Sequence, residues 1–182
     1  ISANGRVIAL SKTSDTVFSK GTMGQGFGLI PSDGHVVAPV SGTISMIADT
    51  KHAIGITDKD GLEILVHMGV DTVGLKGKPF TIAIKNGQKV KAGEPIATMD
   101  LNFIKEKKLD TTIMVVITNS HEKVDGLDAT EGEAKAGTVV AHAYLKTGKE
   151  DTSDKKLSYD DLATFIIKNV GGKKNIKSVI HC

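Results

Sequence analysis

The chain has 182 residues, and its 23 lysines and arginines nearly balance its 21 aspartates and glutamates, which leaves a formal net charge of +2. This length accommodates one domain of ordinary size and a short appendage. Basic residues are spread along the sequence and tryptophan is absent, so we expect no nucleic-acid partner. The single cysteine excludes an internal disulfide, and no apolar run approaches the roughly 20 residues that span a membrane. Because no signal-peptide pattern is present either, we expect a cytoplasmic protein.

The first 48 residues consist of short apolar runs separated by glycine, proline, serine and aspartate. No segment before residue 100 keeps the 3.6-residue period of an amphipathic helix over three turns. Short runs bounded by turn residues are typical of an all-β fold, here an antiparallel β-sandwich or barrel-sandwich.

Residues 49–73 contain two β-forming runs, 52–56 and 62–68, on either side of the turn sequence Thr57-Asp-Lys-Asp-Gly61. If Lys59 and Asp60 form a two-residue loop, His52 lies directly opposite His67. Directly opposed residues share a face, with Cβ atoms roughly 4.5–5.5 Å apart, so the two imidazoles would meet. A slip of one residue would separate them onto opposite faces unless a bulge restored the alignment.

Two imidazolium ions at that separation repel each other, which lowers the pKa of at least one ring. An imidazole that is neutral near pH 7 can act as a nucleophile, a base or a metal ligand. Spacing alone leaves a second reading equally open, in which both are half-buried strand histidines hydrogen-bonded to the backbone.

The rest of the main domain predicts further strands and one short helix, over residues 100–108. Residues 111–118 form an almost unbroken apolar run, which we expect to be a central strand buried on both faces. The tripeptide Lys-Ala-Gly at 91–93 and again at 135–137 leads each time into an apolar strand, which indicates a duplicated half-motif.

The C-terminal part begins with a polar and charged stretch, 147–157, that we interpret as a linker. Ser158 with an acidic residue three positions later predicts the start of a helix. An apolar stripe at Leu162, Phe165, Ile166 and Val170 continues this helical fragment. The sequence begins at Ile1 and stops at Cys182 within a predicted strand, so we expect both ends to be cuts from a longer polypeptide.

Several segments resemble, in the same order, the glucose-family enzyme IIA domain of the bacterial phosphoenolpyruvate-dependent sugar phosphotransferase system. They are Val17-Phe-Ser19, Val37-Ala-Pro-Val-Ser-Gly42, Thr50-Lys-His52-Ala-Ile and Glu63-Ile-Leu-Val-His67-Met-Gly-Val-Asp-Thr-Val73. The resemblance implies a phosphoryl-carrier domain over residues 1–146. Residues 158–182 are similar to the start of an enzyme IIB domain, and Cys182 aligns with its phosphorylated cysteine.

The resemblance also implies how the site works. His67 would accept a phosphoryl group from the phosphohistidine of HPr and pass it to the cysteine of a IIB domain, for sugar uptake and phosphorylation. His52 would donate a hydrogen bond to the phosphoryl oxygens, and Thr50 would fix the tautomer of His52.

Asp71 would lie on the rim that meets the partner. No resident cofactor or metal is implied, and a membrane IIC domain would act indirectly, with IIB and IIC on the same polypeptide. The apolar partner face would include Val40, Ile56, Leu65 and Val73.

Two alternatives remain at this point. A zinc-dependent LytM-like hydrolase could use His52, His67 and Asp71 as ligands, although such enzymes carry a His-x-His pair that is absent here. A regulatory binding module could use the same two-histidine face without transferring phosphate, with zinc bridging His52 and His67 at the interface.

Overall fold

The computed structural model describes residues 5–135, 138–147 and 162–167, the last of these as backbone only. Its largest element is an eight-stranded antiparallel sheet in the order β12-β1-β2-β10-β6-β5-β4-β8. The strands of this sheet are β1 (Gly5–Ala9), β2 (Gln25–Ile30), β4 (Gly42–Ile47), β5 (Ala53–Asp58), β6 (Glu63–Met68), β8 (Lys89–Val90), β10 (Ile113–Ile117) and β12 (Gly132–Ala134).

Two three-stranded antiparallel sheets complete the strand pairing. One has the order β3-β9-β7, with β3 (His35–Val37), β7 (Phe80–Ile82) and β9 (Pro95–Met99). The other has the order β11-β13-β14, with β11 (Val124–Ala129), β13 (Thr138–Leu145) and β14 (Leu162–Ile167). The helices are short, as expected for an all-β fold: η1 (Leu10–Lys12), α1 (Thr16–Ser19), η2 (Thr72–Leu75), α2 (Leu101–Glu106) and α3 (Ser120–Lys123).

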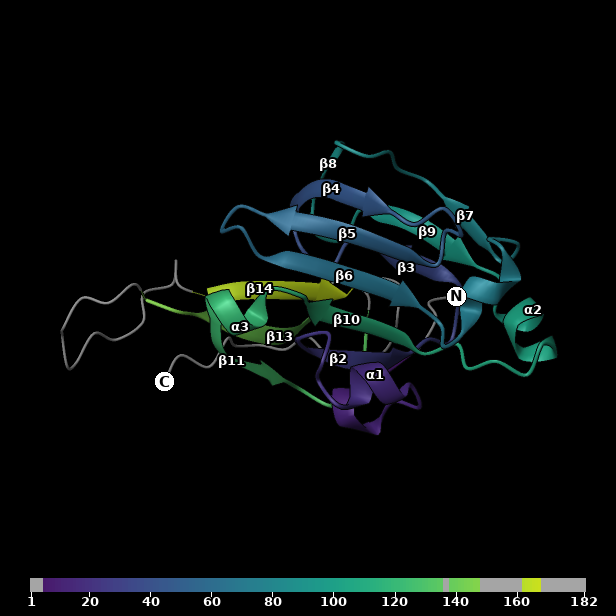
Figure 1. Cartoon of the computed structure of the whole chain (residues 1–182), viewed down its shortest axis with the longest axis horizontal. Coiled ribbons are helices and arrows are strands. Elements are labelled where there is room, and N and C mark those ends of the chain that lie inside the picture. The colour runs from purple at the N-terminus through teal and green to yellow at the C-terminus, as the bar shows by residue number, and fades with distance from the viewer. Residues whose placement is uncertain (1–4, 136–137, 148–161, 168–182) are drawn as a thin grey trace.

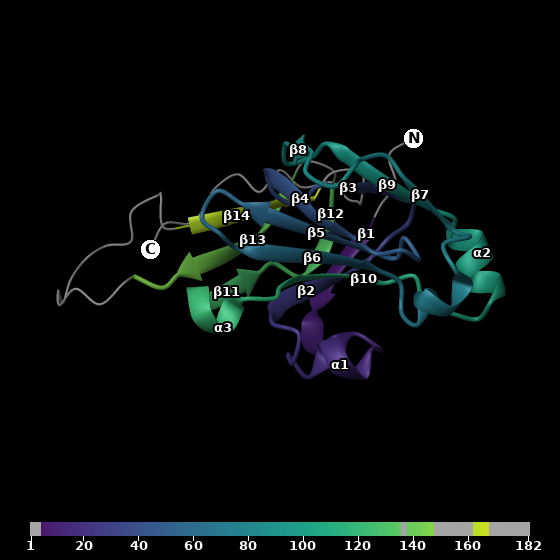
Figure 2. The same ribbon diagram turned by 45° about the horizontal axis from the view of Figure 1, so that its top comes forward.

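The two faces of the large sheet have different neighbours, because successive side chains of a strand point to opposite sides. In β6, Ile64, Val66 and Met68 belong to the main core, which also includes side chains from both small sheets. Leu65 belongs to a second, smaller cluster with Phe18 of α1. Figure 2 shows this layering, with the sheet β3-β9-β7 on one side of the large sheet and α1 on the other. We call the side that carries α1 the outer face.

Two predictions for the second half of the domain are confirmed. Strand β10 is buried at every position and lies between β2 and β6, as the unbroken apolar run predicts. Helix α2 begins where the sequence indicates, and the side chain of Asp100 accepts a hydrogen bond from Phe103 N at 3.0 Å. Within the described residues, no helix has the length and apolar character needed to cross a membrane.

The predicted helix after residue 158 is wrong where the structure describes that region. Residues 162–167 form strand β14, which pairs antiparallel with β13 from Leu162 opposite Tyr144 to Ile167 opposite Thr138. The sequence Leu-Ala-Thr-Phe-Ile-Ile is rich in residues that favour strands. The backbone donors and acceptors along β13 also provide hydrogen bonds that a local helical pattern does not anticipate. Residues 148–161 and 168–182, with the predicted linker and Cys182, lie outside the described residues.

Candidate functional site

The hairpin β5–β6 that carries the site has a three-residue loop, not the two-residue loop expected. Asp58 N donates to Leu62 O at 3.0 Å, and Gly61 takes a left-handed φ of 78°. The Asp58 carboxylate stabilises this turn by accepting hydrogen bonds from Asp60 N and Leu62 N, both at 2.9 Å. A three-residue loop that ends in a left-handed glycine is a common hairpin type. It shifts the register by one residue, so Ala53, not His52, lies opposite His67.

The two imidazoles nevertheless meet. Their centroids are 4.9 Å apart and their planes are inclined at 78°. His52 precedes the first residue of β5, so the alternation of strand side chains does not dictate which face it takes. Lys51 just before it has a left-handed φ of 58°, and His52 O accepts a hydrogen bond from Met68 N at 2.7 Å. A turn at the strand end therefore restores the proximity that the shifted register would have removed.

One nitrogen of His67 is committed to the backbone. His67 Nδ1 lies 2.9 Å from the carbonyl oxygen of Gly69. A carbonyl oxygen only accepts hydrogen bonds, so Nδ1 carries the proton and Nε2 of the neutral ring keeps its lone pair. Gly69 has a left-handed φ of +81°, and a Cβ there would lie 2.4 Å from Thr72 Cγ2. Glycine is therefore required at the residue that fixes the tautomer of His67.

The second histidine is held in a similar way by a side chain. Thr50 Oγ1 lies 2.6 Å from His52 Nδ1, as the sequence predicts for this pair. When the hydroxyl donates to Nδ1, the proton of His52 resides on Nε2. The pair thus offers one imidazole with a free lone pair at Nε2 beside another that can donate from Nε2.

The surroundings keep both rings neutral near pH 7. Burial is the main cause that lowers the pKa of His67 below the ordinary value of 6.5, and the neighbouring His52 lowers it further. The Gly69 carbonyl and the carboxylates of Asp15 and Asp71 oppose this shift without cancelling it. Burial also lowers the pKa of His52. The expected effect of one imidazole on the other contributes to the lowered pKa of His67 only, and there it is smaller than the effect of burial.

An aromatic ring that the sequence reasoning gave no role completes the outer-face site. The ring of Phe18 lies 4.9 Å from that of His67, at an angle of 54°. Phe18 is buried, and Asp15 fixes the start of its helix by accepting hydrogen bonds from Val17 N at 2.8 Å and Phe18 N at 3.1 Å. Sequence signals existed, because Phe18 and Gly69 both lie in segments that carry the family resemblance. Their contacts with His67 depend on long-range packing and turn geometry.

The predicted partner face is partly wrong. Val40 and Ile56 are 4% and 0% exposed and belong to the main core, so they cannot contact a partner. Leu65 lies on the outer face in the cluster with Phe18, and Val73 beyond it is 53% exposed. Asp71 follows the end of β6 in a left-handed conformation and occupies the N-cap position of η2.

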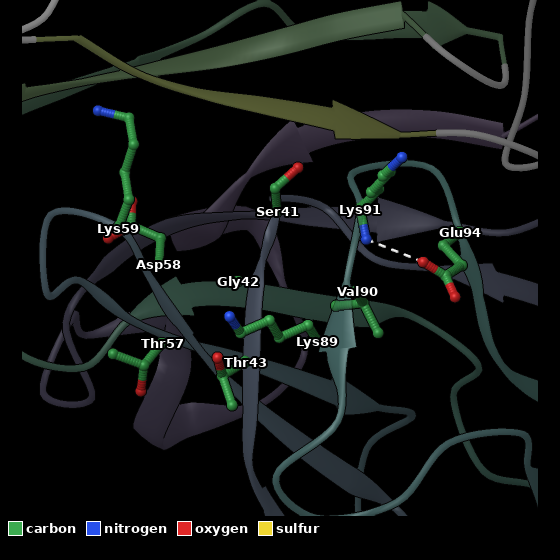
Figure 3. Close-up of a pocket in the computed structure, with 10 residues that line it drawn as sticks. All are labelled: Ser41, Gly42, Thr43, Thr57, Asp58, Lys59, Lys89, Val90, Lys91 and Glu94. Carbon is green, nitrogen blue, oxygen red and sulfur yellow. Dashed lines mark hydrogen bonds between the residues drawn. The ribbon is translucent and has the colours of Figure 1, made fainter.

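A separate cavity of about 520 Å³ lies at the opposite end of β5, lined by Thr57 and Asp58 together with residues of β4 and β8. Figure 3 shows Lys59 and Lys91 on opposite sides of this cavity and Lys89 between them. The three lysines are exposed, and Lys59 pairs with the adjacent Asp60 at 2.9 Å. This lysine-lined cavity contains no histidine and is distinct from the two-histidine site.

The ligand set of a zinc hydrolase is not assembled in the part of the chain that the structure describes. His52 and His67 lie together, but no third histidine, cysteine, aspartate or glutamate joins them as a metal-binding group there. A catalytic zinc ion takes three protein ligands, so the two histidines alone do not fit such a site.

Comparison with known proteins identifies the family. The sequence model of the family described as "phosphoenolpyruvate-dependent sugar phosphotransferase system, EIIA 1" matches residues 1–123. The chain belongs to this enzyme IIA family. It is therefore a phosphoryl-transfer component of a sugar phosphotransferase system, and the comparisons support neither of the two alternatives.

Curated relatives and a solved structure agree with this assignment. The glucose-specific EIIA component of Halalkalibacterium halodurans is 40% identical over 146 residues, which are 80% of this chain and 82% of that protein. The glucose-specific EIICBA component of Streptococcus pneumoniae is 47% identical over 144 residues, covering 79% of this chain and 20% of that protein. The chain thus spans about a fifth of the length of this multidomain relative. The glucose permease IIA structure from Mycoplasma capricolum aligns with a TM-score of 0.68 at 35% identity, over 77% of this chain and 92% of that one.

Proposed function

We propose that His67 is the phosphoryl-carrying residue of this IIA domain and that it reacts through Nε2. The hydrogen bond from Nδ1 to Gly69 O carries this proposal, because it leaves Nε2 as the only ring atom with an available lone pair. The lowered pKa of His67 supports it, since only the neutral imidazole is a nucleophile.

In the first step the Nε2 lone pair attacks the phosphorus of a phosphohistidine on HPr. The new N–P bond forms as the bond to the donor imidazole breaks, and the donor ring leaves with its electron pair. In the second step a cysteine thiolate of a IIB domain attacks the phosphorus, and His67 leaves as a neutral imidazole whose Nδ1–H still donates to Gly69 O. Transfers of this kind depend mainly on positioning and charge stabilisation.

His52 supplies the charge stabilisation. With Thr50 donating to its Nδ1, the Nε2–H of His52 is free to bind a phosphoryl oxygen held on the neighbouring ring 4.9 Å away. This bond matters most while the phosphoryl group is in transit, when negative charge spreads over its oxygens. Its loss should impair onward transfer more than the first loading.

We place the partner surface next to the outer-face cluster of Phe18 and Leu65. Its exposed apolar side chains would be Val17 of α1 and Val73 of η2, at 49% and 53% exposure. A water-poor contact protects a phosphoryl group that would otherwise be hydrolysed. We place the reaction in the cytoplasm, with a IIB domain and a membrane IIC domain on the same longer polypeptide. The multidomain architecture named for the Streptococcus pneumoniae relative supports this arrangement.

The test is incubation with phosphoenolpyruvate, enzyme I and HPr, followed by intact mass at alkaline pH and again after acid. We expect a gain of one phosphate that acid removes, and its absence in His67→Ala. His35→Ala is the matched control, because His35 is an exposed histidine on β3. A phosphate gain that persists in His67→Ala, or its absence from the unaltered protein with active donors, would contradict the proposal.

A further inference from the structure

The carbonyl that fixes the tautomer of His67 is itself held by the chain that leads into β10. Gly69 N donates to Thr112 O at 3.0 Å, and Val70 N donates to Asp110 O at 2.9 Å. A Cβ built on Gly69 would lie only 3.1 Å from Asp110 O, so the two segments are in close contact. The position of Gly69 O therefore depends on the conformation of residues 110–112.

That conformation is set by one carboxylate. Asp110 Oδ1 accepts hydrogen bonds from Thr112 N at 2.9 Å and from Thr112 Oγ1 at 2.6 Å. Thr112 is 3% exposed, and Asp110 is the partner of its hydroxyl. A buried hydroxyl that loses its partner is costly, so the turn would rearrange without this carboxylate.

The same carboxylate is also hydrogen-bonded to the segment that leads into α1. Asp110 Oδ2 accepts a hydrogen bond from Ser14 Oγ at 2.6 Å. Ser14 immediately precedes Asp15, whose side chain caps α1 and so places Phe18 against His67. The segment that carries the aromatic neighbour of His67 and the segment that carries its hydrogen-bond acceptor thus converge on Asp110.

We propose that Asp110 is a positioning residue for phosphoryl transfer: its carboxylate joins the Ser14–Phe18 segment to the Gly69 segment and so fixes the orientation and tautomer of His67. This inference rests on the proposed function of His67 and deepens it. The side chain of Asp110 is hydrogen-bonded to Ser14 and Thr112, so it acts on His67 through these residues and Gly69. Burial raises the pKa of Asp110, but the hydrogen bonds from Ser14 and Thr112 together lower it by more, so the carboxylate is available for this role at neutral pH.

Three variants separate positioning from simple stability. Asp110→Ala removes every side-chain bond to Thr112 and Ser14, and we expect phosphorylation by phospho-HPr to slow by about tenfold, since a 1 Å misplacement of reacting groups costs up to roughly 100-fold. Ser14→Ala removes only the link to α1, with an expected loss of about threefold. Asp110→Asn keeps an oxygen acceptor for Thr112 and an amide that can donate to Ser14, so it should remain close to the unaltered protein.

The second readout needs no donor protein. Nitrogen-15 NMR of the histidine rings at pH 8.5 reports which ring nitrogen carries the proton. We expect His67 to be almost entirely Nδ1-protonated in the unaltered protein and in Asp110→Asn, and to become a mixture of tautomers in Asp110→Ala. The ring-current shift that Phe18 imposes on the His67 protons should also decrease in Asp110→Ala and in Ser14→Ala.

Asp100→Ala is the matched control, because Asp100 also accepts a local backbone hydrogen bond, from Phe103 N at 3.0 Å. It caps α2, whose buried Ile104 belongs to the main core and not to the cluster around Phe18. The variant should lower the melting temperature without changing the rate or the His67 tautomer.

The proposal is overturned if Asp110→Ala folds but keeps the rate and the His67 tautomer of the unaltered protein. It is also overturned if Asp110→Asn is as impaired as Asp110→Ala, because the charge of the carboxylate would then matter more than its hydrogen bonds. If Asp110→Ala does not fold, Ser14→Ala provides the test, and an unchanged ring-current shift in Ser14→Ala overturns the proposal. Failure of the unaltered protein to accept phosphate would refute the function of His67, while the NMR comparison would still test the positioning role.

Discussion

The two ends of strand β5 offer opposite kinds of site. Beside its start, two ring nitrogens have defined partners: His67 Nδ1 lies 2.9 Å from Gly69 O, and His52 Nδ1 lies 2.6 Å from Thr50 Oγ1. At its last residues, the cavity of about 520 Å³ is lined by the exposed lysines Lys59, Lys89 and Lys91 among other residues (Figure 3). The chemistry of this domain therefore depends on fixed polar groups of half-buried rings and does not require a large cavity.

The largest predicted effect uses two glycines with the same backbone angle, one beside the histidine site and one in the loop between β7 and β8. Gly69 and Gly87 both have a φ of +81°, but only at Gly69 would an added Cβ meet other atoms, with Thr72 Cγ2 at 2.4 Å. Alanine at either position costs about 1–2 kcal/mol of folding free energy for the left-handed conformation. Gly69→Ala should additionally displace the acceptor of His67 and slow phosphorylation by about 100-fold.

Stopped-flow or quench-flow measurement of phosphorylation by phospho-HPr, alongside denaturant unfolding of both variants, checks this difference. Equal rates in Gly69→Ala and Gly87→Ala would mean that the Gly69 carbonyl has no part in transfer.

The next effect concerns the second histidine. His52→Gln should still accept phosphate on His67 but pass it to a IIB domain at least about tenfold more slowly, because a charge-stabilising donor is misplaced. Lys89→Gln in the lysine-lined cavity is the control and should transfer normally. Onward transfer is measured by mixing the phosphorylated protein with a IIB domain and following loss of the label. Unimpaired transfer in His52→Gln would remove His52 from the mechanism.

A smaller effect is expected from the threonine that holds His52. Thr50→Val removes a hydroxyl but keeps the shape of the side chain, so it releases the tautomer of His52 without creating a cavity. The loss of one hydrogen bond, worth about 1 kcal/mol, corresponds to roughly a fivefold slower onward transfer. Thr57→Val on β5, beside the lysine-lined cavity, should leave transfer unchanged. If the two variants behave alike, the Thr50 hydroxyl is dispensable.

The smallest effect is on the pH dependence of stability. Folding lowers the pKa of both His67 and His52 below the ordinary value of 6.5, so the unfolded chain binds more protons over that window. Stability from these groups is therefore complete above pH 6.5 and is lost as the pH falls through the folded pKa values. Urea unfolding between pH 7.5 and 5 should show a shallower decline for the His52→Gln, His67→Gln double variant than for the unaltered protein. Parallel curves would show that the rings do not resist protonation.

Much of this arrangement could be predicted from residue types and spacing. The all-β class, the buried strand β10 and helix α2 follow from patterns within single segments. The sequence predicts that His52 and His67 meet, but it does so through a two-residue loop. The loop has three residues, and the register therefore differs by one residue from the expected one. The position of Gly61 in the loop and the turn at Lys51 compensate each other, and neither could be weighed without the folded backbone.

The errors in the prediction come from contacts between distant segments. An apolar residue such as Ile56 could belong to a docking surface. Because side chains alternate between the two faces of β5, however, Ile56 points into the main core. Leu162 to Ile167 has a helical stripe but pairs with β13, an outcome decided by a partner strand some twenty residues away. Phe18 meets His67 only because α1 folds over the outer face, which no local pattern reveals.

The most direct test of the account is to identify which ring nitrogen carries phosphate. Nitrogen-15 and phosphorus-31 NMR of the protein phosphorylated through phospho-HPr at alkaline pH distinguishes the two isomers. We expect phosphate on Nε2 of His67, with the Nδ1–H still donating to the Gly69 carbonyl. Phosphate on Nδ1, or on any residue other than His67, would contradict it.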